Sequence, residues 1–346
     1  QSTPQNPAAL APALYAVAQL WVEWFGPLGL WTTQLTNLLF LLAMLAGVIG
    51  LGRELLSLRL GLTAALLTAL CPALVASSWY FSSDFPLAAC TTLGLWLLAA
   101  TRGFTRPWPA AALAAWSVVG CLVKMTYALY MLLPALGVLA LGLLKAQARR
   151  HNCPPDQAGD TSAGAAGRAP RLRIAAISCA TLLLWGAALV VLRGDWLERD
   201  LSTLLLHLGP GAVEPDLGDF EIISPWSIRG LLSVPAFAAM DMPLPLLLLA
   251  LPGLVALHRR LSLGGRWLPV LFIWGVTLTV TLFPHRQARY ILPLYPVLCL
   301  AATWWVEASL PRHWRDKASV GLVSAFASVL LLTHFHPTPW WLNTEI

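Results

Sequence analysis

The sequence has little charge and no cysteine pattern that suggests disulfides. Only 11% of its 346 residues are charged, whereas soluble domains average roughly 25%. Since 58% of the residues are hydrophobic, this shortage of charge argues against an ordinary soluble domain and favours many membrane-spanning segments over one large core. Five of the six cysteines lie in or at the ends of apolar runs, and Cys153 stands alone in a basic loop, so we expect no disulfides.

The chain has an excess of positive charge, with a net charge of +6. Such a charge can indicate nucleic-acid binding, but the basic residues here are spread over short loops between apolar runs, which is typical of membrane orientation. Sixteen of the 22 Lys and Arg residues fall on one set of alternate loops, which we assign to the cytoplasm. The other six, on the outer side, are Lys124, Arg193, Arg199, Arg229, Arg286 and Arg289.

Ten apolar runs approach the length of about 20 residues that crosses a bilayer. They cover roughly residues 32–51, 60–80, 87–101, 110–123, 127–144, 174–192, 241–257, 267–283, 290–306 and 318–334. We interpret the runs on either side of Asp84, and those on either side of Lys124, as two spans and a tight turn rather than as one kinked helix. The amphipathic residues 10–25 predict a helix lying in the membrane interface. The predicted fold is therefore all-α, a polytopic bundle of about ten spans with an N-terminal interfacial helix.

The spans divide the chain into four regions with different expected locations. Residues 1–31 lie outside in this topology although no signal peptide precedes them, so we expect a further helix ahead of Gln1. The linker at 145–173 is rich in Pro, Gly and Ala and is expected to be flexible and cytoplasmic. In chain order the regions are an outer loop remnant with the interfacial helix (1–31), an N-terminal bundle (32–144), the linker (145–173) and a C-terminal bundle (174–346) with an outer loop at 193–229.

The segment FPHRQARYILPLYP, residues 283–296, places three basic side chains at the outer edge of the membrane, against the orientation rule. Two interpretations stay open. The arginines can extend to the headgroups while the tyrosines join the aromatic belt of the interface. Alternatively, Arg286 and Arg289 point at one anionic group, because their spacing of three residues puts both on one side of a helical turn and the planar guanidinium suits phosphate.

Two further outer turns carry single charged residues. In SSWYFSSDFPLAAC, Asp84 either caps a helix that has Pro86 in its first turn or contributes a carboxylate to a site. In VVGCLVKMTYALYMLLP, Lys124 either extends to the interface or contributes an ammonium. Together, a carboxylate, an ammonium and two guanidiniums at one membrane boundary would bind an anionic lipid headgroup and act on it.

The order of these three turns resembles the motifs of GT-C fold membrane glycosyltransferases that use polyprenyl-phosphate sugars. The branch in question contains protein O-mannosyltransferase-like, lipid A aminoarabinose transferase-like and rhizobial core-sugar transferase-like enzymes. The similar segments are SSDFPLA around Asp84, GCLVKMT from Gly120 to Thr126 and ARYILPLYP from Ala288 to Pro296. The resemblance spans most of the chain, which would be incomplete at its N-terminus, and the last segment is the most specific.

The resemblance implies a reaction as well as a fold. Such an enzyme, a hexosyl- or pentosyl-transferase, moves a sugar from a polyprenyl-phosphate carrier to a hydroxyl of a glycolipid, a polysaccharide or a protein. It implies a multi-pass protein of the bacterial inner membrane with its active site on the periplasmic side. The acidic outer loop matches no metal-ligand spacing, so we expect neither a metal nor another cofactor.

The resemblance also implies roles for single residues. Arg and Lys would stabilise the charge on the leaving lipid phosphate without a protonated acid. The general base of the family lies in the first outer loop, which this sequence does not contain, so Asp84 is expected to orient the acceptor. The expected donor phosphate-binding residues are Lys124, His285, Arg286, Arg289 and Tyr290.

Two alternative functions are considered beside the transferase. A catalytically silent subunit of the same fold would bind the lipid and transfer nothing, and the missing base keeps this alternative open. A membrane transporter would need ionisable residues near the middle of its spans and two matching halves with broken helices. The ionisable residues of this sequence lie at span ends, and the sequence shows no internal repeat.

Overall fold

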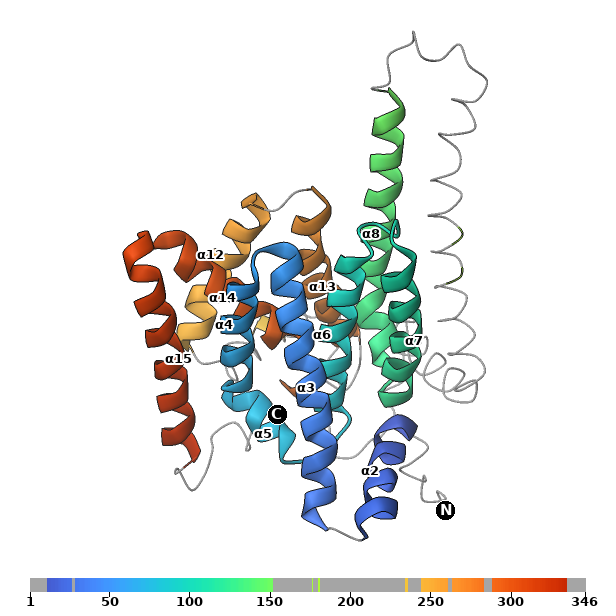
Figure 1. The fold of residues 1–346 in the computed structure, drawn as a ribbon, viewed down its shortest axis with the longest axis vertical. Helices are drawn as coiled ribbons and strands as arrows, with labels where there is room; N and C mark the ends of the chain where they lie inside the picture. The colour runs from blue at the N-terminus through green and yellow to red at the C-terminus, as the bar shows by residue number, and fades with distance from the viewer. Residues whose placement is uncertain are drawn as a thin grey trace, which may run out of the picture.

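The protein is described here from a computed structural model. It describes residues 11–26, 29–151, 244–260, 263–282 and 288–334, and four single positions at 176, 180, 234 and 235. Throughout these ranges the regular secondary structure is helical, which confirms the all-α prediction (Figure 1). The predicted linker and outer loop lie almost wholly outside the described residues.

Helices occupy every predicted span except 174–192, which falls outside the described residues apart from two positions. The predicted interfacial helix is present as α2 (Pro12–Phe25). The other elements are α3 (Leu30–Leu55), α4 (Leu58–Ala69), α5 (Pro72–Ser78), α6 (Asp84–Ala100), α7 (Pro107–Val123), α8 (Thr126–His151), α12 (Leu244–Arg260), α13 (Leu263–Leu282), the 3-10 turn η2 (Ala288–Ile291), α14 (Leu294–Ser309) and α15 (Arg312–His334). Because α8 continues to His151, the first part of the predicted linker is helical.

In the part of the chain that the structure describes, fewer helices are long and apolar enough to cross a membrane than the ten spans predicted for the whole chain. Among the described residues, α3 and the segment Thr126–Leu144 of α8 are each long and apolar enough to cross a membrane. Helices α4 and α5 form a third candidate together, but they meet at 60°. The bend lies at Pro72, which has no N–H to continue the hydrogen bonding of α4. Helices α6 and α7 are apolar but shorter, so a bundle of ten spans is not confirmed.

The breaks at Asp84 and Lys124 separate distinct helices, as the sequence predicts. Helix α6 begins at Asp84, whereas α7 ends at Val123 and α8 begins at Thr126. Large buried side chains from several helices fill the core between them, among them Phe85, Tyr127 and Tyr295. Helix α14 packs against both α4 and α12, so segments from the two halves of the chain share this core.

Helices α12 and α14 approach each other so closely that their backbones touch. A Cβ atom added to Gly253 of α12 would lie 2.6 Å from the carbonyl carbon of Ala301 and would contact the carbonyl oxygen of Ala301 as well. No side chain larger than hydrogen fits at this crossing without moving one of the helices.

The bundle has two ends with different charged groups. The first, called the Asp84 end, holds the beginnings of α3, α6, α8 and α14, and α2 covers part of it, with Tyr15 packed edge-on against Phe81 at 5.1 Å. The second, called the Glu54 end, holds the opposite ends of these helices and the pair Glu54–Arg102. Along α6 the two ends are about 24 Å apart, at 1.5 Å per residue. Basic residues that we assigned to opposite sides, such as Arg102 and Lys124, lie at opposite ends.

Candidate functional site

Asp84 is the first residue of α6, and its side chain is only 5% exposed. The residue before the helix, Ser83, makes no side-chain capping bond. The Asp84 carboxylate instead faces two cations: Oδ1 lies 2.5 Å from Lys124 Nζ, and Oδ2 lies 3.3 Å from Arg289 Nε. The structure therefore places Asp84 in an ion-pair cluster, where its position in the first turn of a helix also favours its negative charge.

Lys124 occupies the break between α7 and α8, where its backbone is extended. Its side chain is 23% exposed and donates a hydrogen bond to Asp84. The same ammonium lies 4.6 Å from the ring centroid of Tyr290, within the range of a cation–π interaction. A lysine that extended to the membrane interface would point away from the bundle, so this interpretation does not describe Lys124.

Arg289 and Tyr290 belong to η2, the short turn that leads into α14. The Arg289 side chain is 53% exposed, and its Nε–H side faces Asp84. The Tyr290 carbonyl accepts a hydrogen bond of 3.1 Å from the Tyr130 hydroxyl, which ties this turn to α8. His285 and Arg286 lie outside the described residues, so the pairing of Arg286 with Arg289 stays a prediction.

The structure thus brings together residues from all three predicted turns. We call Asp84, Lys124, Arg289 and Tyr290 the Asp84 cluster. One carboxylate opposes two cations, so the cluster carries a net charge of +1 in its fully ionised form. The more exposed cation, Arg289, retains donors on a planar group that suits a phosphate oxygen pair. This arrangement is chemically suited to binding an anion beside Arg289 and Lys124.

Two residues that position the cluster were not identified from the sequence. Asn37 of α3 is buried, and its Nδ2 donates to the carbonyls of Ser78 at 2.6 Å and Tyr80 at 3.1 Å. These bonds hold the loop that leads into Asp84. Tyr130 of α8 likewise holds η2, because its hydroxyl donates to the Tyr290 carbonyl. A signal existed for Asn37, because an amide inside an apolar run is costly unless it has a partner.

Gly120, the first residue of GCLVKMT, makes room for the ring of Tyr127, which packs against α7 close to Lys124. A Cβ atom at this position would lie 2.5 Å from the ring of Tyr127. Tyr127 is fully buried, and its hydroxyl lies 3.2 Å from the Ser117 hydroxyl. The glycine therefore allows α8 to turn back against α7 directly after Lys124.

Metal ligands do not gather in the part of the chain that the structure describes. No group of three His, Cys, Asp or Glu side chains there is close enough to hold a metal ion. The acidic outer loop at 193–229 lies outside that part.

Comparison with models of protein families gave no match for this chain, and comparison with curated proteins gave no match either. The similarity to GT-C glycosyltransferases therefore depends on the three sequence motifs, and the functional assignment that it implies is a proposal.

Proposed function

We propose that the chain is an integral-membrane glycosyltransferase whose Asp84 cluster binds the phosphate of a polyprenyl-phosphate sugar. One observation carries this proposal. Three motifs that are far apart in the sequence meet in one cluster, with Lys124 and Arg289 on either side of the same carboxylate. The acceptor would be a hydroxyl of a glycolipid, a polysaccharide or a protein.

The cluster has the chemistry that such a transfer needs at its leaving group. As the acceptor oxygen bonds to the anomeric carbon, the bond from that carbon to the phosphate oxygen breaks, and negative charge develops on the lipid phosphate. Lys124 and Arg289 would stabilise this charge with donors that the fold already holds at the site. Asp84 contacts both cations and would hold them in place. The acceptor's proton goes to a base that we assign to none of the described residues.

The membrane setting is supported by apolar helices and by aromatic side chains at the Asp84 end. Trp24, Phe25 and Trp31 are all exposed there, on α2 and at the start of α3. Exposed tryptophans beside an amphipathic helix suit the boundary between headgroups and hydrocarbon. We propose that the chain is a multi-pass protein of the bacterial inner membrane, with the Asp84 end on the periplasmic side and the Glu54 end in the cytoplasm.

This orientation predicts which substituted cysteines react from outside the cell. The exposed positions Tyr80 and Thr105 lie at the Asp84 and Glu54 ends, respectively. In cells whose outer membrane alone is permeabilised, a charged thiol reagent should label Tyr80→Cys at once and Thr105→Cys only after the inner membrane is opened. The background carries Cys153→Ser and Cys179→Ser, since the other four native cysteines are described and buried. The reverse labelling pattern would show that the assigned orientation is wrong.

The donor site is tested at Arg289. Replacement with Ala should weaken binding of polyprenyl phosphate by about 10- to 150-fold, which corresponds to the loss of about 1.5–3 kcal/mol from a charge-assisted interaction. Arg289→Lys should recover only part of this affinity, because an ammonium keeps the charge and loses the planar fork. Binding is measured on purified variants whose thermal unfolding matches that of the parent.

Arg106→Ala is the matched control, since Arg106 is an exposed arginine at the opposite end of the bundle. If Arg289→Ala binds the donor as the parent does, Arg289 anchors the chain in the interface and the phosphate site lies elsewhere. Sugar transfer, measured on the same preparations, separates an enzyme from a silent binding subunit of the same fold.

A further inference from the structure

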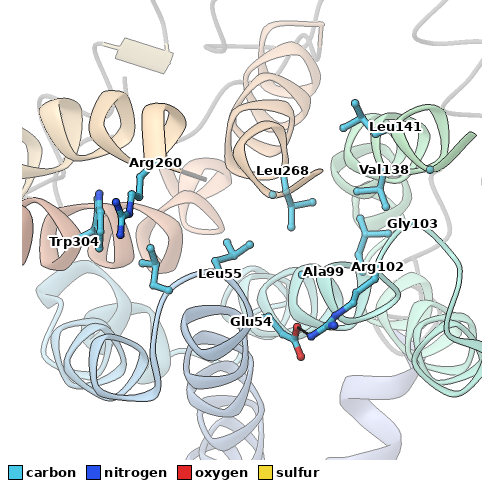
Figure 2. Close-up of a pocket in the computed structure, with 14 residues that line it drawn as sticks. Glu54, Leu55, Ala99, Arg102, Gly103, Val138, Leu141, Arg260, Leu268 and Trp304 are labelled. Carbon is cyan, nitrogen blue, oxygen red and sulfur yellow. Dashed lines mark hydrogen bonds and ion pairs between the residues drawn. The ribbon is translucent and has the colours of Figure 1, made fainter. Parts of the chain in front are cut away.

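A second site with charged groups lies at the Glu54 end, away from the Asp84 cluster. A cavity of about 510 Å³ lies between the ends of α3, α6, α12 and α14, the beginning of α13 and the middle of α8. Figure 2 shows residues that line it. Its volume is in the range of pockets that hold small molecules or lipid headgroups. Five of the fourteen residues that line it are leucines, among them Leu55, Leu98 and Leu268.

Three charged side chains line this cavity, and two of them form an ion pair with each other. Glu54 and Arg102 face each other at 3.4 Å and largely neutralise one another. Arg260 is the third, and among the described residues no carboxylate lies within ion-pair distance of it. Figure 2 places Arg260 and Trp304 on one side of the cavity and the Glu54–Arg102 pair on the other. The cavity therefore combines a net positive charge, located at Arg260, with leucine side chains in part of its wall.

The backbone around Arg102 is held in an uncommon conformation. Arg102 and Phe104 have φ angles of 49° and 59°, in the left-handed region that non-glycine residues seldom adopt. Thr101 stabilises this turn, because its hydroxyl donates to the Leu98 carbonyl and accepts from the Phe104 N–H. Phe104 is buried. The turn therefore holds Arg102 beside Glu54, so the Glu54 carboxylate is paired with Arg102. Arg260 then stays available to a ligand.

We propose that this cavity binds the headgroup of an anionic phospholipid, with Arg260 at the phosphate and the first acyl carbons against the leucines. The leucines in the wall favour a lipid over free phosphate, which would gain only the contact with Arg260. A choline ammonium would gain nothing from Arg260, and Glu54 is already paired with Arg102, so the site favours a net negative headgroup over a zwitterionic one. The proposal rests on the membrane setting proposed above and does not depend on sugar transfer.

The test measures lipid binding to the purified full chain in a non-ionic detergent. The probes are short-chain phosphatidylglycerol, phosphatidylcholine with the same chains, and inorganic phosphate. Phosphatidylglycerol should bind at least about 10-fold more tightly than either other probe. Arg260→Ala should weaken this binding by about 10- to 100-fold, whereas Arg260→Lys should retain part of it, because a guanidinium–phosphate contact is charge-assisted.

Two further variants keep the test specific. Arg106→Ala removes an exposed arginine at the same end that does not line the cavity, so it should leave phosphatidylglycerol binding unchanged. Ala99→Leu fills part of the cavity and keeps every charge, so it should weaken lipid binding as well. Unfolding temperatures without lipid show that each variant is folded.

Three results would overturn the proposal. One is equal binding of phosphatidylcholine and phosphatidylglycerol. Another is an equal loss in Arg260→Ala and Arg106→Ala, which would indicate attraction by general surface charge. The third is unchanged binding in both Arg260→Ala and Ala99→Leu. Each of these results leaves the donor site at Arg289 untouched, because polyprenyl-phosphate binding is measured separately at the other end of the bundle.

Discussion

Replacement of Asp84 with Asn is expected to lower the free energy of unfolding by about 2–3 kcal/mol, because it leaves the partly buried ammonium of Lys124 without its carboxylate partner. The substitution keeps the shape of the side chain and removes only its charge. Lys124, which is 23% exposed, would then lie beside the guanidinium of Arg289 with no carboxylate between them. Unfolding in mixed detergent micelles, followed by circular dichroism, measures this loss.

A double-mutant cycle separates the ion pair from other effects of the substitution. Lys124→Met alone should cost less than Asp84→Asn, because Asp84 keeps Arg289 as its partner. In the Asp84→Asn, Lys124→Met double variant one cation remains, at the half-exposed Arg289, so part of the stability should return. We expect a coupling energy of about 1–3 kcal/mol, as for contacting residues in one network. Additivity within about 0.5 kcal/mol would show that the Asp84–Lys124 contact contributes little.

The same variant distinguishes positioning from simple electrostatic attraction in the proposed donor site. Asp84→Asn raises the net charge of the Asp84 cluster from +1 to +2, so attraction alone predicts tighter binding of polyprenyl phosphate. If Asp84 instead holds Lys124 and Arg289 in place, as their contacts suggest, the two cations separate and binding weakens. Donor affinity measured on folded Asp84→Asn protein therefore gives opposite signs for the two roles.

Gly253 is expected to give the second large effect. Gly253→Ala should destabilise the protein by about 2 kcal/mol, and Gly253→Leu by more, because the new side chain meets the backbone of α14 at Ala301. This cost exceeds the gain of about 1 kcal/mol that alanine brings to a helix interior over glycine. Thermal unfolding of both variants in detergent measures the effect.

Gly321 of α15 supplies the matched control for this prediction. It is also a helical glycine, but a Cβ atom added there would meet nothing within 4 Å. Gly321→Ala should therefore stabilise the protein slightly, by up to about 1 kcal/mol. Equal stability changes at Gly253 and Gly321 would mean that α12 and α14 do not pack through direct backbone contact.

The positions of the helices were predicted well from the sequence, whereas the predicted number of membrane spans is not confirmed by the described residues. Apolar runs show where helices lie, and a charge between two runs, at Asp84 or Lys124, shows where one helix ends. Hydropathy does not report how an apolar run bends. The run at 60–80 contains Pro72, where α4 and α5 turn by 60°, so an apolar run of suitable length is not one straight helix.

The candidate site was predicted in part, for a similar physical reason. Charged residues in an apolar chain are conspicuous, so Asp84, Lys124 and Arg289 were identified as candidates from the sequence. Their contacts depend on how helices pack, and no local pattern encodes a pairing between residues 84 and 289. Tyr130 was missed because a tyrosine inside an apolar helix looks like any packed core residue in sequence, whereas Asn37 could have been noticed as an amide within an apolar run.

The packing of α14 against α4 has a consequence for how the protein is made. About 225 residues separate Ala69, the end of α4, from Leu294, the start of α14. At roughly 5–20 residues per second, a ribosome needs roughly 10–45 s to synthesise that interval. During this time α4 lacks its packing partner α14. Because Arg289 lies directly ahead of α14, the Asp84 cluster is completed only when this late helix docks, so the site assembles among the last parts of the protein.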